Sequence, residues 1–392
     1  MSYIGSKPAD AVLETDDITD GVITTAKIAD SSVTTEKIVA DTNFRNIVIN
    51  GDMSQAQRGT SFTSNGYGLD RFIMDESTDG AVTVSQDTTV PSGQGFATSL
   101  KVDCTTADAS IGAAQYCILT TKFEGQNLQY LKYGTSSAQS LTLSFWVKSV
   151  KTGTYCVNFT KEAGGETRME TPIEYTISSA STWEKKTITL SPTAGSTTLI
   201  TNSAGAIVNS NASGFRVIFT LAAGTDWHGT NNTWVAASDK MSTSNQVNFL
   251  DSTSNNFYIT GVQLEAGTTA SDFEFLPVDV NLQRCQRYYQ FIGGVNNATI
   301  AVGSSDSTTV SSFLINYMTT MRTSPTIAQS TLAVTDNVGY DLTVNSIAAS
   351  TFSSYSGRVF FNHNATATQY RPAHLKPTAT ASTAGITLSA EL

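Results

Sequence analysis

Apolar and polar residues alternate one by one along two stretches in the middle of the chain. In residues 141–148, Leu, Leu, Phe and Val occupy the odd positions, while Thr, Ser, Trp and Lys occupy the even ones. Residues 215–221 repeat the pattern, with Phe, Val, Phe and Leu on the odd positions. A period of two is typical of a β-strand with one buried face, so both stretches are predicted to be strands.

Further stretches have the length and composition of strands, and clusters of Gly, Ser, Asn or Thr bound each of them. They are residues 46–50, 71–74, 100–104, 115–123, 155–161, 183–190 and 257–264. So many strands, with few helical stripes among them, predict a two-sheet antiparallel β-sandwich over residues 44–282.

The last of these strands changes its pattern at a glycine. Phe257 and Ile259 share one parity, whereas Val262 and Leu264 share the other, and Gly261 lies where the parity changes. A β-bulge at this glycine would place all four apolar side chains on the same face.

After the Gly-Gly pair at 293–294 the apolar stretches become shorter. Strands are predicted at residues 300–302, 331–334, 342–344, 357–361 and 386–388. They predict a second, smaller β domain over residues 295–392, which a linker at 283–294 joins to the sandwich. The predicted fold class is therefore all-β.

The first 43 residues follow a different rule, a repeat of ten residues. Residues 20–29 (DGVITTAKIA) and 30–39 (DSSVTTEKIV) align directly, and residues 10–18 form a fainter copy. Each copy has too few apolar side chains for one chain to offset the entropy of ordering. Copies from several chains could instead enclose a shared seam of Ile18, Ile23, Ile28, Val33 and Ile38. Residues 1–43 are thus either the stalk or attachment segment of an elongated oligomer, which we favour, or a disordered polar leader.

A turn signal closes the first predicted strand. The tripeptide Asn-Gly-Asp at 50–52 follows an apolar run, and Asn-Gly is a strong tight-turn pair. Arg58 and Arg71 lie in a region with few other bases. We expect these arginines to hold carbonyl groups of the turn or a carboxylate such as Asp70, which is a structural role.

Two groups of segments resemble bacteriophage proteins. Residues 46–62 (NIVINGDMSQAQRGTSF) and 69–72 (LDRF) resemble the opening of a domain found in many tail-fibre and related virion proteins. Its closing segment is similar to residues 259–267 (ITGVQLEAG), 273–275 (FEF) and 285–290 (CQRYYQ).

Other segments extend the resemblance. The predicted strands at 143–148 and 182–190 are similar to those of galactose-binding-like, carbohydrate-module jelly rolls. The N-terminal repeat is similar to tail-fibre leaders, and residues 313–327 resemble a strand motif that follows the closing segment in phage fibres. Together they imply a virion appendage with a jelly-roll body. They do not imply a bound sugar, because this fold often serves as a scaffold.

The resemblance also raises the question of a metal. Carbohydrate-module jelly rolls often hold a structural calcium with acidic side chains near the first and last strands. Asp52 and Glu265 are the candidates here, but Gln263 stands where a second acidic residue would be more persuasive. We therefore expect no metal and no other cofactor.

Charge and composition restrict the partners. The 392 residues carry a formal net charge of -10, from 23 Lys and Arg against 33 Asp and Glu. This balance disfavours binding to nucleic acid or to anionic membrane surfaces. No apolar run reaches the ~18–20 residues of a membrane span, and residues 1–6 lack the pattern of a secretory leader. We expect synthesis in the host cytoplasm and a place on the virion as a tail appendage, without membrane insertion.

The four cysteines have no metal-ligand spacing, and most lie in apolar, strand-like stretches. Buried free thiols are the prediction, and a disulfide between Cys104 and Cys117 is the alternative.

Catalytic patterns are absent from the sequence. The three histidines are far apart, and neither HExxH nor GxSxG occurs. Glycan depolymerases need two carboxylates across a sugar cleft, and the densest acidic group is the glutamates at 162, 166, 170 and 174. Gly164-Gly165 and Pro172 interrupt any helix there, so these glutamates are expected on a solvated edge. We expect a non-enzymatic protein without catalytic residues.

Aromatic residues are better candidates for recognition. Trp227, His228 and Trp234 lie in a polar loop, where two indoles and several amides would suit a sugar. The alternative is that both tryptophans pack under the loop and pin it to the sandwich. Trp146 and Trp183 lie within predicted strands, where packing is the default.

The second domain has its own candidate loop, the Asn- and Thr-rich residues 362–374, which we expect to be exposed. His363, Tyr370 and His374 are its candidates for contact with a host surface glycan or protein. The predicted protein is then a homotrimeric tail fibre that binds phage tail or capsid proteins through its N-terminus and contacts the host. Alternatives are a capsid fibre or tail adaptor with a purely structural role, or a monomeric glycan-binding module.

Overall fold

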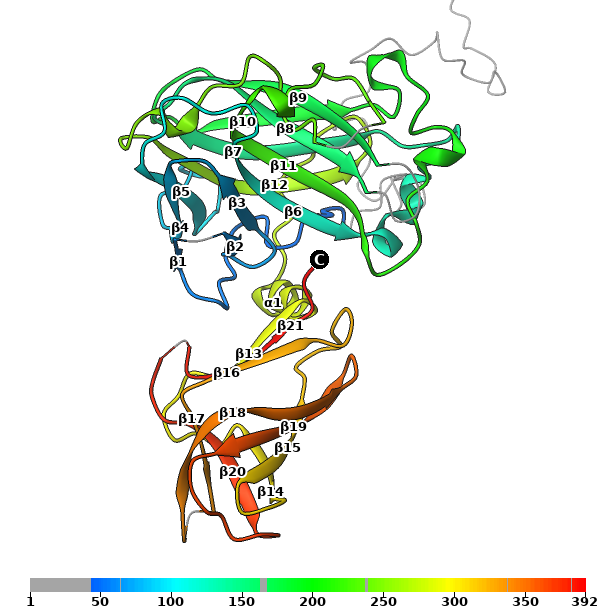
Figure 1. Ribbon diagram of the computed structural model, residues 1–392. Helices are drawn as coiled ribbons and strands as arrows, with labels where there is room; N and C mark the ends of the chain where they lie inside the picture. Colours follow the sequence, from blue (N-terminus) through cyan, green and yellow to red (C-terminus); the bar gives the residue numbers. More distant parts are fainter. Residues whose placement is uncertain (1–43, 64, 163–167, 237–238, 337, 382) are drawn as a thin grey trace, which may run out of the picture. The chain divides into compact units, whose positions relative to one another are not determined.

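The computed structural model describes residues 44–63, 65–162, 168–236, 239–336, 338–381 and 383–392 (Figure 1). The N-terminal repeat and its predicted seam residues lie outside the described residues. The chain divides into Met1–Arg45 and Asn46–Leu392, and the second unit contains the helix and the strands described below.

Two six-stranded antiparallel sheets form the sandwich, which confirms the all-β prediction. The first, the β7 sheet, has the order β1 (Ser61–Phe62), β4 (Ala81–Asp87), β5 (Ser99–Thr106), β12 (Asn256–Ala266), β7 (Leu141–Ser149) and β10 (Glu184–Leu190). The second, the β11 sheet, has the order β2 (Gly66–Tyr67), β3 (Ile73–Ser77), β6 (Tyr116–Glu124), β11 (Ser213–Ala223), β8 (Gly153–Lys161) and β9 (Met169–Ile177). The chain passes back and forth between the two sheets, as in a jelly roll.

Short 3-10 helices lie in the connections between these strands. They are η4 (Gly125–Leu131), η5 (Ala194–Ser196), η6 (Ser203–Gly205), η7 (Thr225–Trp227) and η8 (Phe249–Asp251).

The alternating stretches place their apolar residues between the two sheets, as predicted. Phe145 of β7 and Phe219 of β11 are fully buried, and their ring centroids lie 5.2 Å apart with the rings nearly perpendicular. Trp146, the next residue of β7, points to the opposite face of its sheet and is half-buried. Period two therefore separates the side chains between the sheets from those on the outer faces, although outer positions such as Thr142 and Thr220 are also buried.

The predicted bulge in β12 is confirmed. The pairing of β12 with β7 shifts register between Thr260 and Gln263, and Gly261 has a φ of 62°. The four apolar side chains on either side of it are fully buried. Glycine suits this position for two reasons. It adopts a positive φ without strain, and a Cβ here would lie 2.5 Å from Phe96 Cζ.

Residues 46–50 are not a strand, although a strand was predicted there. The Ile47 N–H donates to the Leu264 carbonyl (2.9 Å), so the segment does run beside β12. The Asn46 side chain then takes over the pairing, donating to the Val262 carbonyl (3.1 Å) and accepting from the Leu264 N–H (3.1 Å). Side-chain bonds replace the regular ladder of backbone bonds that defines a strand.

Strand β9 corrects the prediction of a solvated acidic edge. Glu170 lies on this edge strand but is fully buried. It forms an ion pair with Arg168 (2.6 Å) and accepts a hydrogen bond from the Lys240 N–H (2.6 Å). Glu162 pairs with Arg216 at 3.2 Å. Both glutamates are therefore held by basic partners rather than left to solvent.

The C-terminal domain combines a small sheet with a closed barrel. Helix α1 (Val278–Gln286) leads into a three-stranded antiparallel sheet of β13 (Tyr289–Gly293), β21 (Gly385–Ser389) and β16 (Thr326–Ser330). The barrel has the order β14 (Ala301–Ser305), β15 (Val310–Asn316), β19 (Ser356–His363), β18 (Asp341–Phe352), β17 (Leu332–Thr335) and β20 (Pro372–Pro377). Residues 283–294, predicted as a linker, comprise the end of α1 and strand β13. Among the described residues, no helix has the length and apolar character needed to cross a membrane.

All four cysteines are free and buried, which confirms that prediction and leaves the Cys104–Cys117 disulfide unformed. Burial raises the pKa of the Cys117 thiol well above its ordinary value. A buried thiol with so little thiolate is a packing group rather than a nucleophile.

Candidate functional site

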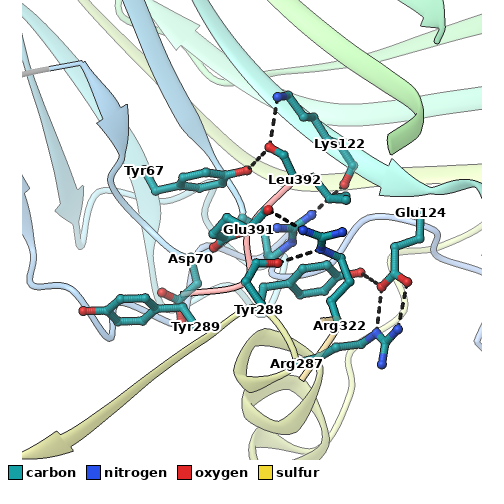
Figure 2. A network of polar contacts seen from close by, with 12 residues as sticks. Tyr67, Asp70, Lys122, Glu124, Arg287, Tyr288, Tyr289, Arg322, Glu391 and Leu392 are labelled. Carbon is teal, nitrogen blue, oxygen red and sulfur yellow. Dashed lines mark hydrogen bonds and ion pairs between the residues drawn. The ribbon is translucent and has the colours of Figure 1, made fainter. Parts of the chain in front are cut away.

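Residues 58–71, residues 287–289 and the end of the chain meet at one place, which we call the junction (Figure 2). The opening segment contributes Arg58, Asp70 and Arg71, and Glu391 reaches them from beyond the end of β21. Residues 288–289, from the closing segment, lie against the two arginines. The junction thus connects the sandwich to the C-terminal domain.

Glu391 is the common partner of the two arginines. Its side chain is only 7% exposed, and its Oε1 lies 2.9 Å from Arg58 Nη2. Its Oε2 pairs with Arg71 Nη1. Arg71 is itself buried, with a φ of 72°, and its Nη2 donates to the Lys122 carbonyl (2.7 Å). This carboxylate therefore neutralises a guanidinium that water does not reach.

Asp70 completes the charge balance of the junction. It lies 3.4 Å from Arg58 Nη1 and accepts a hydrogen bond from Gln57 Nε2 at 2.8 Å, so the predicted contact between Arg58 and Asp70 is confirmed. Burial raises the pKa of Asp70 to about 6, although Gln57 and Arg58 act to lower it. The arginines do not hold the turn at 50–52. The Asn50 side chain does so instead, donating to the carbonyls of Gln55 (3.0 Å) and Asp70 (2.9 Å).

Two tyrosine rings cover the arginines. The Arg58 guanidinium lies 3.6 Å from the centroid of the Tyr289 ring, and that of Arg71 lies 3.6 Å from the Tyr288 ring. Stacking on an aromatic face stabilises a guanidinium that has lost its hydration. The consecutive tyrosines of the closing segment thus have a physical role without any ligand.

A second group of contacts lies beside the first. Arg287 Nε and Nη2 donate to the two oxygens of Glu124 at 2.7 and 2.8 Å, and the Tyr288 hydroxyl donates to Glu124 at 2.6 Å. Burial alone would raise the pKa of Glu124, but these hydrogen bonds outweigh it and lower the pKa. Arg322 binds the Ala390 carbonyl (2.6 Å) and the Glu391 carbonyl (2.8 Å) and so holds the same terminal segment.

The predicted recognition loop is packed against the sandwich. Trp234 is 1% exposed, and its Nε1 donates to the Ser191 carbonyl at 2.9 Å. Trp227 is half-buried, with its ring edge-on to Tyr116 at a centroid distance of 4.9 Å. His228 contacts the Ala223 carbonyl at 3.3 Å. The two indoles do not form one exposed platform, and this arrangement is the pinning alternative.

The segment after that loop also covers the outer face of the β11 sheet. Asn158 Nδ2 donates to the Lys240 carbonyl (2.6 Å), and the Thr220 hydroxyl donates to the Met241 carbonyl (2.7 Å). Both donors are on strands and are fully buried. This sheet therefore offers little free surface to a ligand here.

The candidates in the C-terminal domain have different surroundings. His363 is buried, contrary to the expected exposed loop, and its ring nitrogens contact the Ser311 hydroxyl (3.2 Å) and the Ala365 carbonyl (2.9 Å). His374 is half-buried on β20. Tyr370 is 80% exposed, at a turn with a φ of 65°. Only Tyr370, of these three, is openly available to a partner.

The chain was compared with known proteins. No protein-family model and no curated protein matches it. The enzymatically active domain of bacteriophage CBA120 tailspike protein 4 is 14% identical, with a TM-score of 0.31, over 57% of this chain and 21% of that chain. A family 11 carbohydrate-binding module from Clostridium thermocellum is 11% identical, with a TM-score of 0.28, over 54% and 99%. TmCBM61, solved with β-1,4-galactotriose, is 13% identical, with a TM-score of 0.27, over 57% and 99%. Likenesses this low assign no function.

The candidate calcium ligands act as hydrogen-bond acceptors. Asp52 accepts from the Ser54 hydroxyl (3.1 Å) and from Asn281 Nδ2 (3.2 Å), and Glu265 accepts from Gln263 (3.0 Å) and from the backbone and hydroxyl of residue 271. Within the described ranges, no three His, Cys, Asp or Glu side chains lie close enough together to hold a metal ion.

Sequence reasoning missed most of the junction. Arg58 and Asp70 are close in sequence, whereas Glu391 lies 320 residues after Arg71. One signal was available: Arg58 and Arg71 lie close together in sequence, and a guanidinium needs a counter-ion once it is buried. The sequence does not indicate which of the 33 acidic residues supplies it.

Proposed function

We propose that this chain is a non-enzymatic structural protein of a bacteriophage virion. In this proposal it is a tail fibre that attaches through its N-terminal repeat and presents the C-terminal domain to the host surface. The repeat would associate between chains, with a homotrimer as the expected oligomer and tail or capsid proteins as partners.

One observation carries this proposal. The two segments that resemble the opening and closing of a phage fibre domain supply Arg58, Asp70, Arg71 and the tyrosines that cover them, all at the junction. Asp70, Glu124 and Glu391 are each paired with an arginine there, and Arg322 is bound by backbone carbonyls, so the junction holds two β domains together rather than awaiting a substrate. A joint of this kind suits a protein that transmits force between a particle and a surface.

A purely structural role, as a capsid fibre or adaptor, is the second candidate. The burial of Trp234 and His363 favours it, because both were predicted to contact a receptor. The two candidates differ in whether the protein itself binds the host.

The test uses intact virions and the full-length chain. Antibodies against the C-terminal domain, imaged by electron microscopy, should label the tail, and added purified protein should compete with phage adsorption. Labelling of the head alone would contradict the tail-fibre role. Tail labelling without competition would favour the purely structural candidate.

The N-terminal attachment is tested separately. A phage whose gene lacks codons 1–43 should assemble particles without this protein, while the truncated chain still folds. Normal incorporation of the truncated protein would contradict the anchoring role.

A further inference from the structure

A groove lies on the outer face of the β7 sheet, and none of the residues that line it belongs to the junction. Its space of about 250 Å³ is bounded by strands β12, β7 and β10 and by the loops at 93–96 and 272–275. It is lined by aromatic and polar side chains, chiefly Gln94, Ser144, Trp146, Lys185, Asp272 and Phe275.

The floor of the groove follows from strand alternation. Trp146 is one of the outward positions of β7, and Lys185 of β10 and Thr260 of β12 are its cross-strand partners. Cross-strand partners share a face of the sheet, so the half-buried indole lies between a lysine and a hydroxyl.

Three phenylalanines form one wall. The ring of Phe96 lies 5.1 Å from the rings of Phe273 and Phe275, which lie 4.9 Å from each other. Phe275 is 51% exposed although its neighbour Phe96 is buried. The bulge at Gly261 makes this wall possible, because any Cβ there would strike the Phe96 ring. This wall thus has a buried inner ring, Phe96, packed against the sheet and an exposed outer ring, Phe275.

The polar groups of the groove are unused. Within the described part of the chain, no hydrogen bond or ion pair engages the side chains of Gln94, Ser144, Lys185 or Asp272. The junction is the opposite case, since the carboxylates of Asp70, Glu391 and Glu124 are each paired with an arginine. Unpaired polar groups beside exposed rings are the usual composition of a ligand site.

We propose that this groove binds a pyranose unit of an uncharged glycan chain. The apolar C–H face of a pyranose stacks on Trp146 or Phe275, as on other aromatic platforms. Its hydroxyls donate to Asp272 and accept from Lys185, and Gln94 does both. The opposite charges of Lys185 and Asp272 balance, which favours a neutral sugar over an acidic one. The volume, below the ~300–1,000 Å³ of drug-sized sites, suits a short stretch of chain.

This inference goes beyond the proposed function, because it places glycan contact on the sandwich and holds whether or not the chain is a fibre. The test uses the full-length protein and ligand-observed NMR. The probes are di- to tetrasaccharides of glucose, galactose, mannose and N-acetylglucosamine, followed by titration of each one that binds. At least one saccharide should bind. Asp272→Asn and Phe275→Ala should each lower the affinity for it tenfold or more without lowering the melting temperature of the protein.

Matched variants locate the site. Asp226→Asn removes an exposed carboxylate on η7, next to the predicted recognition loop, and Tyr130→Ala removes a half-exposed ring on η4. Both should bind the sugar as the wild type does. The proposal is overturned if no saccharide binds, if the groove variants bind normally, or if Asp226→Asn weakens binding as much as Asp272→Asn. Gln94→Ala, on an exposed loop, replaces Phe275→Ala should that variant not fold.

Discussion

The sandwich and the barrel are both antiparallel β structures, but they keep water from their apolar side chains in different ways. The sandwich core contains connected rings, such as Phe145 between Tyr175 and Phe219, each at 5.2 Å. The described part of the barrel has one such pair, Phe313 and Phe361, at 6.1 Å. The sandwich also covers part of the outer face of the β11 sheet with its own loop, through the bonds to Lys240 and Met241.

The barrel instead leaves apolar side chains outside. Val302 and Leu314 are 60% and 55% exposed. They are next to each other on paired strands, because Gly303 pairs with Phe313. The two β domains thus differ in how much of their apolar surface their own residues bury. The barrel depends more on contacts with neighbouring elements. The sheet of β13, β21 and β16, together with the junction, is the support that the structure provides.

The largest expected effect on stability comes from removing an ion pair of the junction. Glu391→Ala leaves the buried Arg71 guanidinium without its counter-ion, and breaking a buried pair in this way costs about 3–5 kcal/mol of unfolding free energy. We also expect the single denaturant transition to split, with the barrel unfolding first. Urea titration followed by circular dichroism measures both changes.

Asp341→Ala is the control for that variant. Asp341 pairs with Lys376 at 2.8 Å on the barrel surface, with its side chain 57% exposed. Surface pairs contribute about 0–1 kcal/mol, so this loss should be small. Equal losses from the two variants would show that the junction is no stronger than a surface pair.

The next effect concerns pH. Because the pKa of Asp70 is raised to about 6 in the fold, against 3.8 ordinarily, the folded chain holds this proton more tightly than the unfolded chain. Its contribution to stability is full below pH 3.8 and is lost as pH rises toward 6, by up to about 3 kcal/mol. Asp70→Asn should remove this part of the pH dependence, as measured by unfolding free energies between pH 4 and 7.5. Parallel curves for the variant and the wild type would contradict it.

A smaller effect tests the sandwich alone. Gly261→Ala forces a positive φ on alanine and places its Cβ against Phe96, whereas Gly267→Ala, at a φ of 110°, meets nothing within 4 Å. Overpacking typically costs ~1–3 kcal/mol, so Gly261→Ala should be the less stable variant by about that amount. Similar melting temperatures for the two variants would mean that Phe96 moves aside freely.

The smallest effect is expected on the outside of the barrel. Val302→Ser and Leu314→Ser should change the stability of a monomer by less than about 0.5 kcal/mol, as surface substitutions do. If the barrel packs against its copies in the proposed homotrimer, the same variants should shift the sedimentation velocity toward monomer. If both variants sediment as the wild-type trimer does, the contacts between chains lie elsewhere.

Much of the sandwich could be predicted because strands such as β7 and β11 carry apolar side chains at every second position. Alternation identified β7 and β11, and a change of parity identified the bulge at Gly261. Strand β9 was missed because Pro172 and its glutamates suggest a loop, although the proline lies on an edge strand. Strand β20 was missed because Pro372 and Pro377 stand at its two ends.

The sites were less predictable, because they depend on contacts between distant segments. The loop that contains Trp227 and Trp234 has the composition of a sugar site, but Trp234 is buried and so is not available to a sugar. Trp146 was expected to pack in the core because it is a tryptophan within a strand, yet it lines the groove on the outer face. Strand parity gives its face, but a sequence does not show which loops stand over that face.

The pairing of Arg71 with Glu391 also has a consequence for how the protein is made. The two residues are separated by 320 positions, so at ~5–20 residues per second the ribosome supplies the anion tens of seconds after the cation. During that interval a sandwich that closed early would hold an unneutralised guanidinium. We expect such an intermediate to be less stable than the finished chain, so that a chain interrupted before Glu391 is cleaved more readily by proteases.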